Sequence, residues 1–160
     1  MTVVADTSPL RYLVLINQVQ ILDTLFHRVL VPETVARELS HVRTPEPVRK
    51  WMLTPPNWIE VRNPPFPEIA GLDHLDKGEL DAIALAQQSA ASLLLIDDGE
   101  ARSAAESLGF GVLGTIGILE RAEQSGLLNF ADAFSELEKT NFHLSETLRH
   151  LIRERYRLNS

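Results

Sequence analysis

Two short apolar runs that each end on a carboxylate constrain this chain more than any other feature of its sequence. Val3-Val4-Ala5 leads into Asp6, and the run L-L-L-I at 93–96 leads into Asp97-Asp98. Neither run alternates apolar with polar residues, which is typical of strands that are buried on both faces. Segments with helical spacing of apolar residues lie between such runs. The pattern predicts an α/β fold, with a central, mostly parallel sheet of about five strands and helices on both faces.

The expected elements follow from the same spacing. The first helix should begin at Ser8-Pro9, with Ser8 as its cap and Pro9 in its first turn. A group of five prolines (Pro55, Pro56, Pro64, Pro65 and Pro67) places the third strand in a loop-rich stretch. We expect strands at 3–5, 28–31, 58–61, 93–96 and 112–113, and further helices at 18–25, 33–39, 46–53, 77–89, 100–108, 114–124, 131–139 and 144–156.

Length, charge and cysteine content limit the possible classes of function. A chain of 160 residues with 44% hydrophobic and 23% charged residues has the size and composition of one globular domain, residues 1–160. The absence of cysteine excludes disulfides and zinc–thiolate sites, and fits a cytoplasmic location. No leader segment and no apolar stretch of roughly 20 residues is visible, so no membrane association is expected. The net charge of -7 is the wrong sign for a nucleic-acid binder, unless clustered acids hold cations.

Acidic residues in apolar context recur along the chain. Ligands of open parallel sheets bind beyond the carboxyl ends of the strands, where Asp6, Asp97 and Asp98 are expected. Carboxylates brought close together cannot all stay ionised without a cation. Oxygen ligands, with no cysteine and only scattered histidines, favour Mg²⁺ or Mn²⁺, ions that align water against a phosphodiester.

Each acid also has an ordinary structural explanation. Asp6 could cap the first helix, and Glu38 could be an exposed helical residue. Glu79 lies three residues after Asp76, which is the spacing of a capping box. One of the paired acids at 97 and 98 should cap the helix that follows. Positions 79 and 81 lie about 200° apart on a helix, so Glu79 and Asp81 cannot both face one ion.

The spacing of the whole set resembles the PIN-domain family, which includes the VapC-type toxin ribonucleases of bacterial toxin–antitoxin pairs. The resemblance covers about residues 2–125, and the C-terminal helices at about 131–156 are less diagnostic. It is closest to a subgroup in which G-E before A-I-A-L-A is typical. The segments that carry it are V-V-A-D-T-S-P-L, V-P-E-T-V-A-R-E-L, G-E-L-D-A-I-A-L-A, L-L-L-I-D-D-G-E-A-R and G-V-L-G-T-I-G-I-L.

The resemblance implies a three-layer PIN-like fold and a role for each acid. Asp6 would be the first metal ligand, Glu38 the second acid and Glu79 the third, with Asp81 as the fallback. Asp98 would be the fourth acid. The family often has Thr-x-Asp at this last site, whereas this chain has Ile96-Asp97-Asp98, so Asp97 stays open as a ligand beside Asp98. Hydroxyl groups at Thr7, Ser8 and Thr115 would orient ligands or water.

The implied function is metal-dependent hydrolysis of single-stranded RNA by the toxin half of a toxin–antitoxin pair. An antitoxin protein and a second copy of the chain are the implied partners. Near the motifs, Arg11, Arg37 and Arg102 could contact the RNA backbone, although exposed arginines are usually solvated. The basic stretch Arg149–Arg157 is most simply an exposed helix face.

Two other functions compete with this interpretation. The first is a catalytically inactive PIN-fold module that binds nucleic acid or protein, which would be expected to lack at least one of the four acids. The second is a phosphatase of the haloacid-dehalogenase type. That enzyme needs Asp-x-Asp after the first strand, and residues 6–8 are Asp-Thr-Ser, so we disfavour it.

Overall fold

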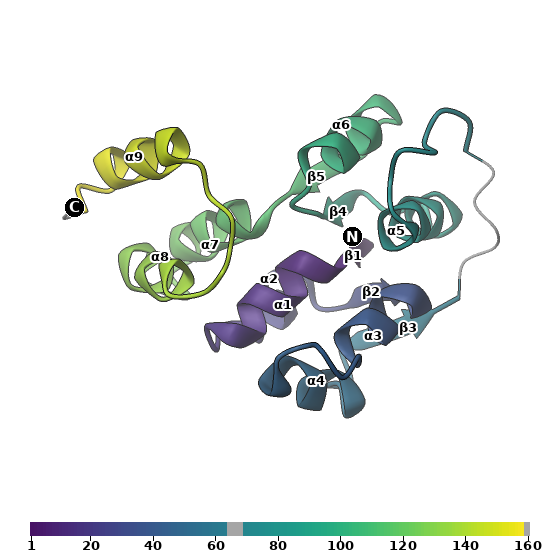
Figure 1. Ribbon diagram of the computed structural model, residues 1–160, viewed down its shortest axis with the longest axis horizontal. Coiled ribbons are helices and arrows are strands. Elements are labelled where there is room, and N and C mark those ends of the chain that lie inside the picture. Colours follow the sequence, from purple (N-terminus) through teal and green to yellow (C-terminus); the bar gives the residue numbers. More distant parts are fainter. Residues whose placement is uncertain (64–68, 159–160) are drawn as a thin grey trace.

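Residues 1–63 and 69–158 are described by the computed structural model, and they form an α/β fold around a parallel sheet. Figure 1 shows α5 on one side of the molecule and α7, α8 and α9 gathered on the other. The strands are β1 (Val3–Ala5), β2 (Val29–Pro32), β3 (Ile59–Arg62), β4 (Leu93–Leu95) and β5 (Gly111–Leu113). The helices are α1 (Thr7–Leu15), α2 (Ile21–Phe26), α3 (Glu33–Leu39), α4 (Glu46–Leu53), α5 (Lys77–Gln88), α6 (Gly99–Ser107), α7 (Thr115–Gln124), α8 (Phe130–Glu138) and α9 (Glu146–Arg155).

The five strands follow the order β3-β2-β1-β4-β5, and every described pair is parallel. The prediction of a mostly parallel sheet of about five strands is confirmed. From β1 the chain passes to β2 on one side, and from β4 it passes to β5 on the other. The neighbouring strands β1 and β4 therefore mark the topological switch point, where a crevice opens beyond the carboxyl ends of an open parallel sheet.

Both faces of the sheet are buried, which explains the unbroken apolar runs. Val3 and Ala5 belong to a hydrophobic cluster with α1, α2, α3, α4, α7 and α8. Val4 points to the opposite face and packs in a second cluster with α5 and α6. Successive strand residues point to opposite faces, so a strand between two helical layers needs apolar residues at every position.

The C-terminal helices pack against the same core as the first half of the chain. Phe130 and Phe134 of α8 are fully buried, and Ile152 of α9 is 5% exposed. All three belong to the cluster that contains Val3 and Ala5. This packing fixes the position of the segment between α8 and α9, which reaches the candidate site described below.

The predicted elements exist, and most of their ends shift by one to three residues. The prediction that Ser8 caps the first helix was wrong, because the helix begins at Thr7 and the N-cap position belongs to Asp6. The reason is that pairing within the sheet continues past β1: the Asp6 N–H donates to the Leu95 carbonyl at 2.9 Å. The chain thus turns from strand to helix within one residue. The prolines predicted to form a loop at 64, 65 and 67 lie outside the described residues.

Among the described residues, no helix is both long and apolar enough to cross a membrane.

Candidate active site

Asp6 lies at the switch point of the sheet, directly after β1, and it is 7% exposed. Burial raises the pKa of its carboxyl group from 3.8 to about 7. The negative charges of Asp76, Glu79 and Glu38 raise this pKa further, and only the backbone N–H of Thr7 lowers it. A carboxylate in this position is poorly neutralised by the protein itself.

Two more acids enter from the first turn of α5, where they form a capping box. The Glu79 N–H donates to Asp76 Oδ1 at 2.9 Å, and the Asp76 N–H donates to Glu79 Oε1 at 3.1 Å. Burial raises the pKa of Glu79, and the charges of Asp76, Asp98 and Glu38 add to this effect. Glu79 can therefore take part in the capping box and still face the other acids, because the box uses only its Oε1 and leaves Oε2 free of that interaction.

Gly78, between these two acids, shows how closely the carboxylates converge. A Cβ atom added there would lie 3.0 Å from Glu38 Oε1, 3.5 Å from Asp6 Oδ1 and 3.5 Å from Asp76 Oδ1. These oxygens come from three separate parts of the chain, and the missing side chain of Gly78 leaves the space between them. A residue with a side chain would fill this space.

Glu38 comes from α3 and is held in place by a hydroxyl group. Thr7 Oγ1 donates to Glu38 Oε2 at 2.9 Å, while Glu38 Oε1 is the oxygen nearest the Cβ position of Gly78. Glu38 is exposed, as its helical position suggested, yet it lines the same cavity as Asp6. The hydroxyl of Thr7 thus holds one acid of this cavity, and its predicted role in orienting metal ligands or water stays a prediction. For Ser8, the described contacts include no hydrogen bond from its side chain.

Asp81 lies away from this group and is neutralised. It is 3% exposed, and its Oδ2 accepts hydrogen bonds from Lys77 Nζ at 3.0 Å and from the Thr34 hydroxyl. Asp81 does not line the cavity that contains Glu79. The helical geometry that separates positions 79 and 81 thus directs Glu79 to the cavity and Asp81 to α3.

Asp97 and Asp98 follow β4, and each has a hydrogen-bonded role. Asp98 Oδ2 accepts from the Ala101 N–H at 3.0 Å and caps α6, as expected of one member of the pair. Asp97 accepts from both the N–H and the hydroxyl of Thr115, at 2.7 Å each. Thr115 is fully buried, so Asp97 ties the end of β4 to the start of α7. Both carboxylates line the cavity that contains Asp6.

These acids line a cavity of about 800 Å³ at the carboxyl edge of the sheet. Arg11 and Arg102 line it as well, together with a wall from the segment between α8 and α9 that includes Phe142, His143 and Leu144. Tyr12 holds this wall, because its hydroxyl donates to Asn141 Oδ1 at 2.8 Å and its ring meets Phe142 edge to face at 5.0 Å.

Sequence reasoning missed two parts of this site. Asp76 was interpreted only as a helix cap, although its spacing from Glu79 already placed it beside a candidate ligand. The wall at 141–144 carries no recognisable motif. Its position depends on α8 and α9 packing, which no local pattern reveals.

The residues present fit a hard divalent cation by chemistry. The donors are carboxylate oxygens without lysine or arginine partners in the described contacts, and the space at Gly78 lies between three of them. As they stand, the described residues contain no group of three His, Asp or Glu side chains arranged to hold one ion. The carboxylates are therefore gathered near one another without already forming a ligand set.

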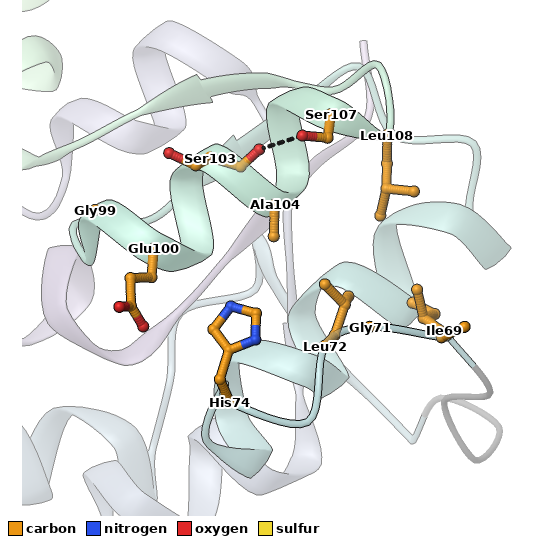
Figure 2. A pocket seen from close by; sticks show the side chains of 11 residues that line it. Ile69, Gly71, Leu72, His74, Gly99, Glu100, Ser103, Ala104, Ser107 and Leu108 are labelled. Carbon is orange, nitrogen blue, oxygen red and sulfur yellow. Dashed lines mark hydrogen bonds between the residues drawn. The ribbon is translucent and has the colours of Figure 1, made fainter.

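A second hollow, of about 700 Å³, lies between α6 and the segment before α5. Figure 2 shows Leu72 and His74 pointing toward α6, with Leu108 facing them across the hollow. Within the described ranges, Glu100 is the only acid in its lining, and the Ser107 hydroxyl donates to the Ser103 carbonyl at 2.9 Å. The grouped carboxylates thus belong to the first cavity.

The parallel sheet, the two helical layers and the acidic cavity at the switch point define an α/β protein with a polar site at one edge. A family model described as PIN domain matches residues 2–157. The chain belongs to the PIN-domain family, a family of nucleases that typically use divalent metal ions. No curated protein matches the chain.

Proposed function

We propose that the protein is a metal-dependent endoribonuclease that hydrolyses phosphodiester bonds of single-stranded RNA. The main support is the convergence of Asp6, Glu38 and Asp76 around the backbone of Gly78, in a chain of the PIN-domain family. The raised pKa of Asp6 and of Glu79 adds to this support, since both result from burial beside other acids. Such grouping destabilises the folded protein unless a cation offsets it.

We assign Mg²⁺ or Mn²⁺ binding to Asp6, Glu79 and Asp98, with Asp97 beside them and Asp76 as a further oxygen donor. A divalent cation, when bound, activates water and stabilises the leaving oxygen of a phosphodiester. Both oxygens of Asp97 accept hydrogen bonds from Thr115, so its main role is to fix the loop that carries Asp98. Asp81, bonded to Lys77 and Thr34, is left out of the assignment.

Glu38 is the residue we assign to the attacking water. Its Oε2 is held by the Thr7 hydroxyl, and its Oε1 is directed to the space at Gly78. That arrangement orients one oxygen toward a nucleophile while the other keeps the side chain in place. Glu38 would thus orient the water and accept its proton.

We further propose that this nuclease is the toxin of a toxin–antitoxin pair, acts in the cytoplasm as a homodimer and is inhibited by an antitoxin protein. The support is the resemblance of its motifs to VapC-type toxins. A short antitoxin-like reading frame immediately upstream would support this role, and its absence would argue against it.

An inactive PIN-fold module that binds nucleic acid or protein is the second candidate. The observation that favours it is that Glu38, Glu79 and Asp98 each already accept a hydrogen bond from the protein. In that case the acids would serve the fold alone, and a divalent cation would bind weakly or not at all.

A cleavage assay separates the two candidates. Purified protein is incubated with labelled single-stranded RNA in Mn²⁺, in Mg²⁺ and in excess chelator. Asp6→Asn is compared with Asp23→Asn, a matched control that alters an exposed acid on α2. Mn²⁺ binding is measured in parallel by calorimetry, which does not depend on turnover.

We expect metal-dependent cleavage by the wild type and by Asp23→Asn, with a loss of at least about 100-fold in Asp6→Asn, as for removal of a group that acts on the reacting atoms. If wild type in chelator and Asp6→Asn both cleave RNA as fast as wild type with metal, the activity comes from a contaminating nuclease and the proposal is refuted. RNA binding without cleavage, and without Mn²⁺ binding, would favour the inactive module.

A further inference from the structure

A second groove lies next to the acidic cavity and carries the opposite charge. It has a volume of about 450 Å³ and lies among α1, α3 and the segment that follows α3. Three arginines and a histidine line it: Arg11, Arg37, Arg43 and His41, which we call the arginine groove. Thr7, Arg11 and Glu38 line both this groove and the acidic cavity, so the two are continuous.

The arginines of this groove are weakly neutralised by the described acids. In the described part of the chain, Arg11 and Arg43 form no ion pair, and the pair between Arg37 and Glu33 is long, at 4.0 Å, and exposed. Of the acids that the structure describes, Glu38 alone belongs to the lining. On a chain of net charge -7, a groove of this composition is a local positive site.

The basic C-terminal stretch provides the contrast. Arg153 and Arg149 contact Glu138 at 2.6 and 3.5 Å, and Arg155 contacts Glu120 at 2.9 Å. The positive charge of α9 is thus largely neutralised by ion pairs within the protein. The arginines of the arginine groove lack such close ion pairs among the described residues.

Arg11 carries the most direct indication of a ligand. Its Nε–H is buried and has no hydrogen-bond partner among the described residues. A buried donor without a partner costs free energy, and a shift of the Arg11 side chain that exposes Nε would let an anionic group in the groove satisfy it. Arg11 lines both the groove and the acidic cavity, so such a group would lie at their junction.

The segment that carries His41 and Arg43 is already fixed in place. The Thr44 hydroxyl donates to the Glu38 carbonyl at 2.7 Å, and Arg49 donates to the Val42 carbonyl at 3.1 Å. The Arg43 N–H donates to His41 Nδ1 at 3.1 Å. Since Nδ1 is the acceptor, the neutral ring carries its proton on Nε2 and can donate it to an anion.

We propose that the arginine groove binds the phosphates of RNA nucleotides on one side of the cleaved bond, and that it directs the strand into the acidic cavity. The inference rests on the proposed nuclease function. Arg11 holds the phosphate at the junction, and Arg37 and Arg43 hold those further out. These contacts position the substrate and carry no base specificity.

An acidic protein segment is the alternative occupant, and it fits the geometry less well. Such a segment would be attracted to Arg37 and Arg43 but repelled at Glu38, the acid that lines both the groove and the acidic cavity. A polynucleotide meets the same acids, but the proposed nuclease must bring its substrate into that cavity, so a strand that runs from the groove into the cavity fits the proposed function. The continuity of the two surfaces therefore favours RNA.

The test compares RNA binding by two double variants with the same change in charge. Arg37→Ala/Arg43→Ala alters the groove, whereas Arg28→Ala/Arg157→Ala removes two exposed arginines outside it. Fluorescence anisotropy of a short labelled single-stranded RNA is measured in excess chelator, between about 50 and 200 mM salt. Chelator prevents metal-dependent cleavage, so the binding result stands even if the proposed nuclease activity is absent.

We expect the groove variant to bind RNA about tenfold more weakly than wild type, with the slope of log Kd against log salt reduced by about 1.4, or about 0.7 for each lost phosphate contact. Arg37→Lys/Arg43→Lys should restore most of the slope, because lysine keeps the charge. The control variant should behave as wild type. Equal affinities and slopes in all proteins would overturn the proposal, and so would arginine-dependent binding of polyglutamate without binding of RNA.

Discussion

Replacement of Asp6 by asparagine should stabilise the folded protein while it abolishes the proposed activity. Asp6 is buried beside Glu38, Asp76 and Glu79, and its pKa is raised from 3.8 to about 7. An asparagine in its place would keep the shape and one hydrogen-bonding oxygen but carry no charge. The gain in stability of Asp6→Asn over wild type should therefore depend on pH, because it follows the ionisation of Asp6 in the wild type.

The sign and size follow from the two pKa values. Below pH 3.8 the carboxyl group is protonated in both the folded and the unfolded protein, so it contributes no pH dependence. Between pH 3.8 and 7 the unfolded chain releases the proton and the folded protein retains it, so the stability of the wild type falls as pH rises. At about 1.36 kcal/mol per pH unit, the full interval corresponds to a loss of about 4 kcal/mol above pH 7.

The assay is urea unfolding of wild type and Asp6→Asn in chelator, from about pH 4 to about pH 8. We expect the free energies of unfolding to differ little near the acidic end, and Asp6→Asn to be more stable by up to about 4 kcal/mol near the basic end. Titrations of groups far from Asp6 cancel in this difference, whereas those of Glu38, Asp76 and Glu79 change with the charge of Asp6. Added Mn²⁺ should stabilise the wild type, by about 2.7 kcal/mol at about 100 times its Kd, and should stabilise Asp6→Asn far less.

The exposed control Asp23→Asn should show no such pH-dependent gain. Two results would refute the argument. In the first, the difference in free energy of unfolding between wild type and Asp6→Asn is constant over the whole pH range. In the second, Asp6→Asn is less stable than wild type at about pH 8. Either result would mean that Asp6 is neutralised in the folded protein.

Three further substitutions test individual contacts. Gly78→Ala places a methyl group 3.0 Å from Glu38 Oε1 and should weaken Mn²⁺ binding at least about tenfold by calorimetry, while the helix keeps or gains up to about 1 kcal/mol from the better propensity of alanine. Thr115→Val removes the hydroxyl donor to Asp97 and should lower the free energy of unfolding by about 1–3 kcal/mol in urea. Phe134→Ala empties a fully buried site in α8 and should cost about 3–5 kcal/mol in the same measurement; a small loss would show that α8 is not part of the cooperative core.

The sequence by itself determined the layers of the fold and the edge at which the site lies. Unbroken apolar runs at 3–5 and 93–95 require burial on both faces, and their carboxyl ends must then share one edge of a parallel sheet. Asp6 and the pair Asp97-Asp98 could be placed there without coordinates, because their neighbours in sequence are the strands themselves. The order of the strands and the start of α1 at Thr7 were not specified by any local pattern.

Only the tertiary structure decided which acids meet. Helical spacing shows that Glu79 and Asp81 face apart, but the packing of α5 against α3 determines which of them enters the cavity. The contact between Thr7 and Glu38 joins residues 31 positions apart, and the contact between Thr115 and Asp97 joins residues 18 apart. Local propensity carries no information about such pairs, because their distance depends on how whole helices pack. For the same reason, the place of Asp76 beside the other acids and the continuity of the arginine groove with the acidic cavity became visible only in the folded chain.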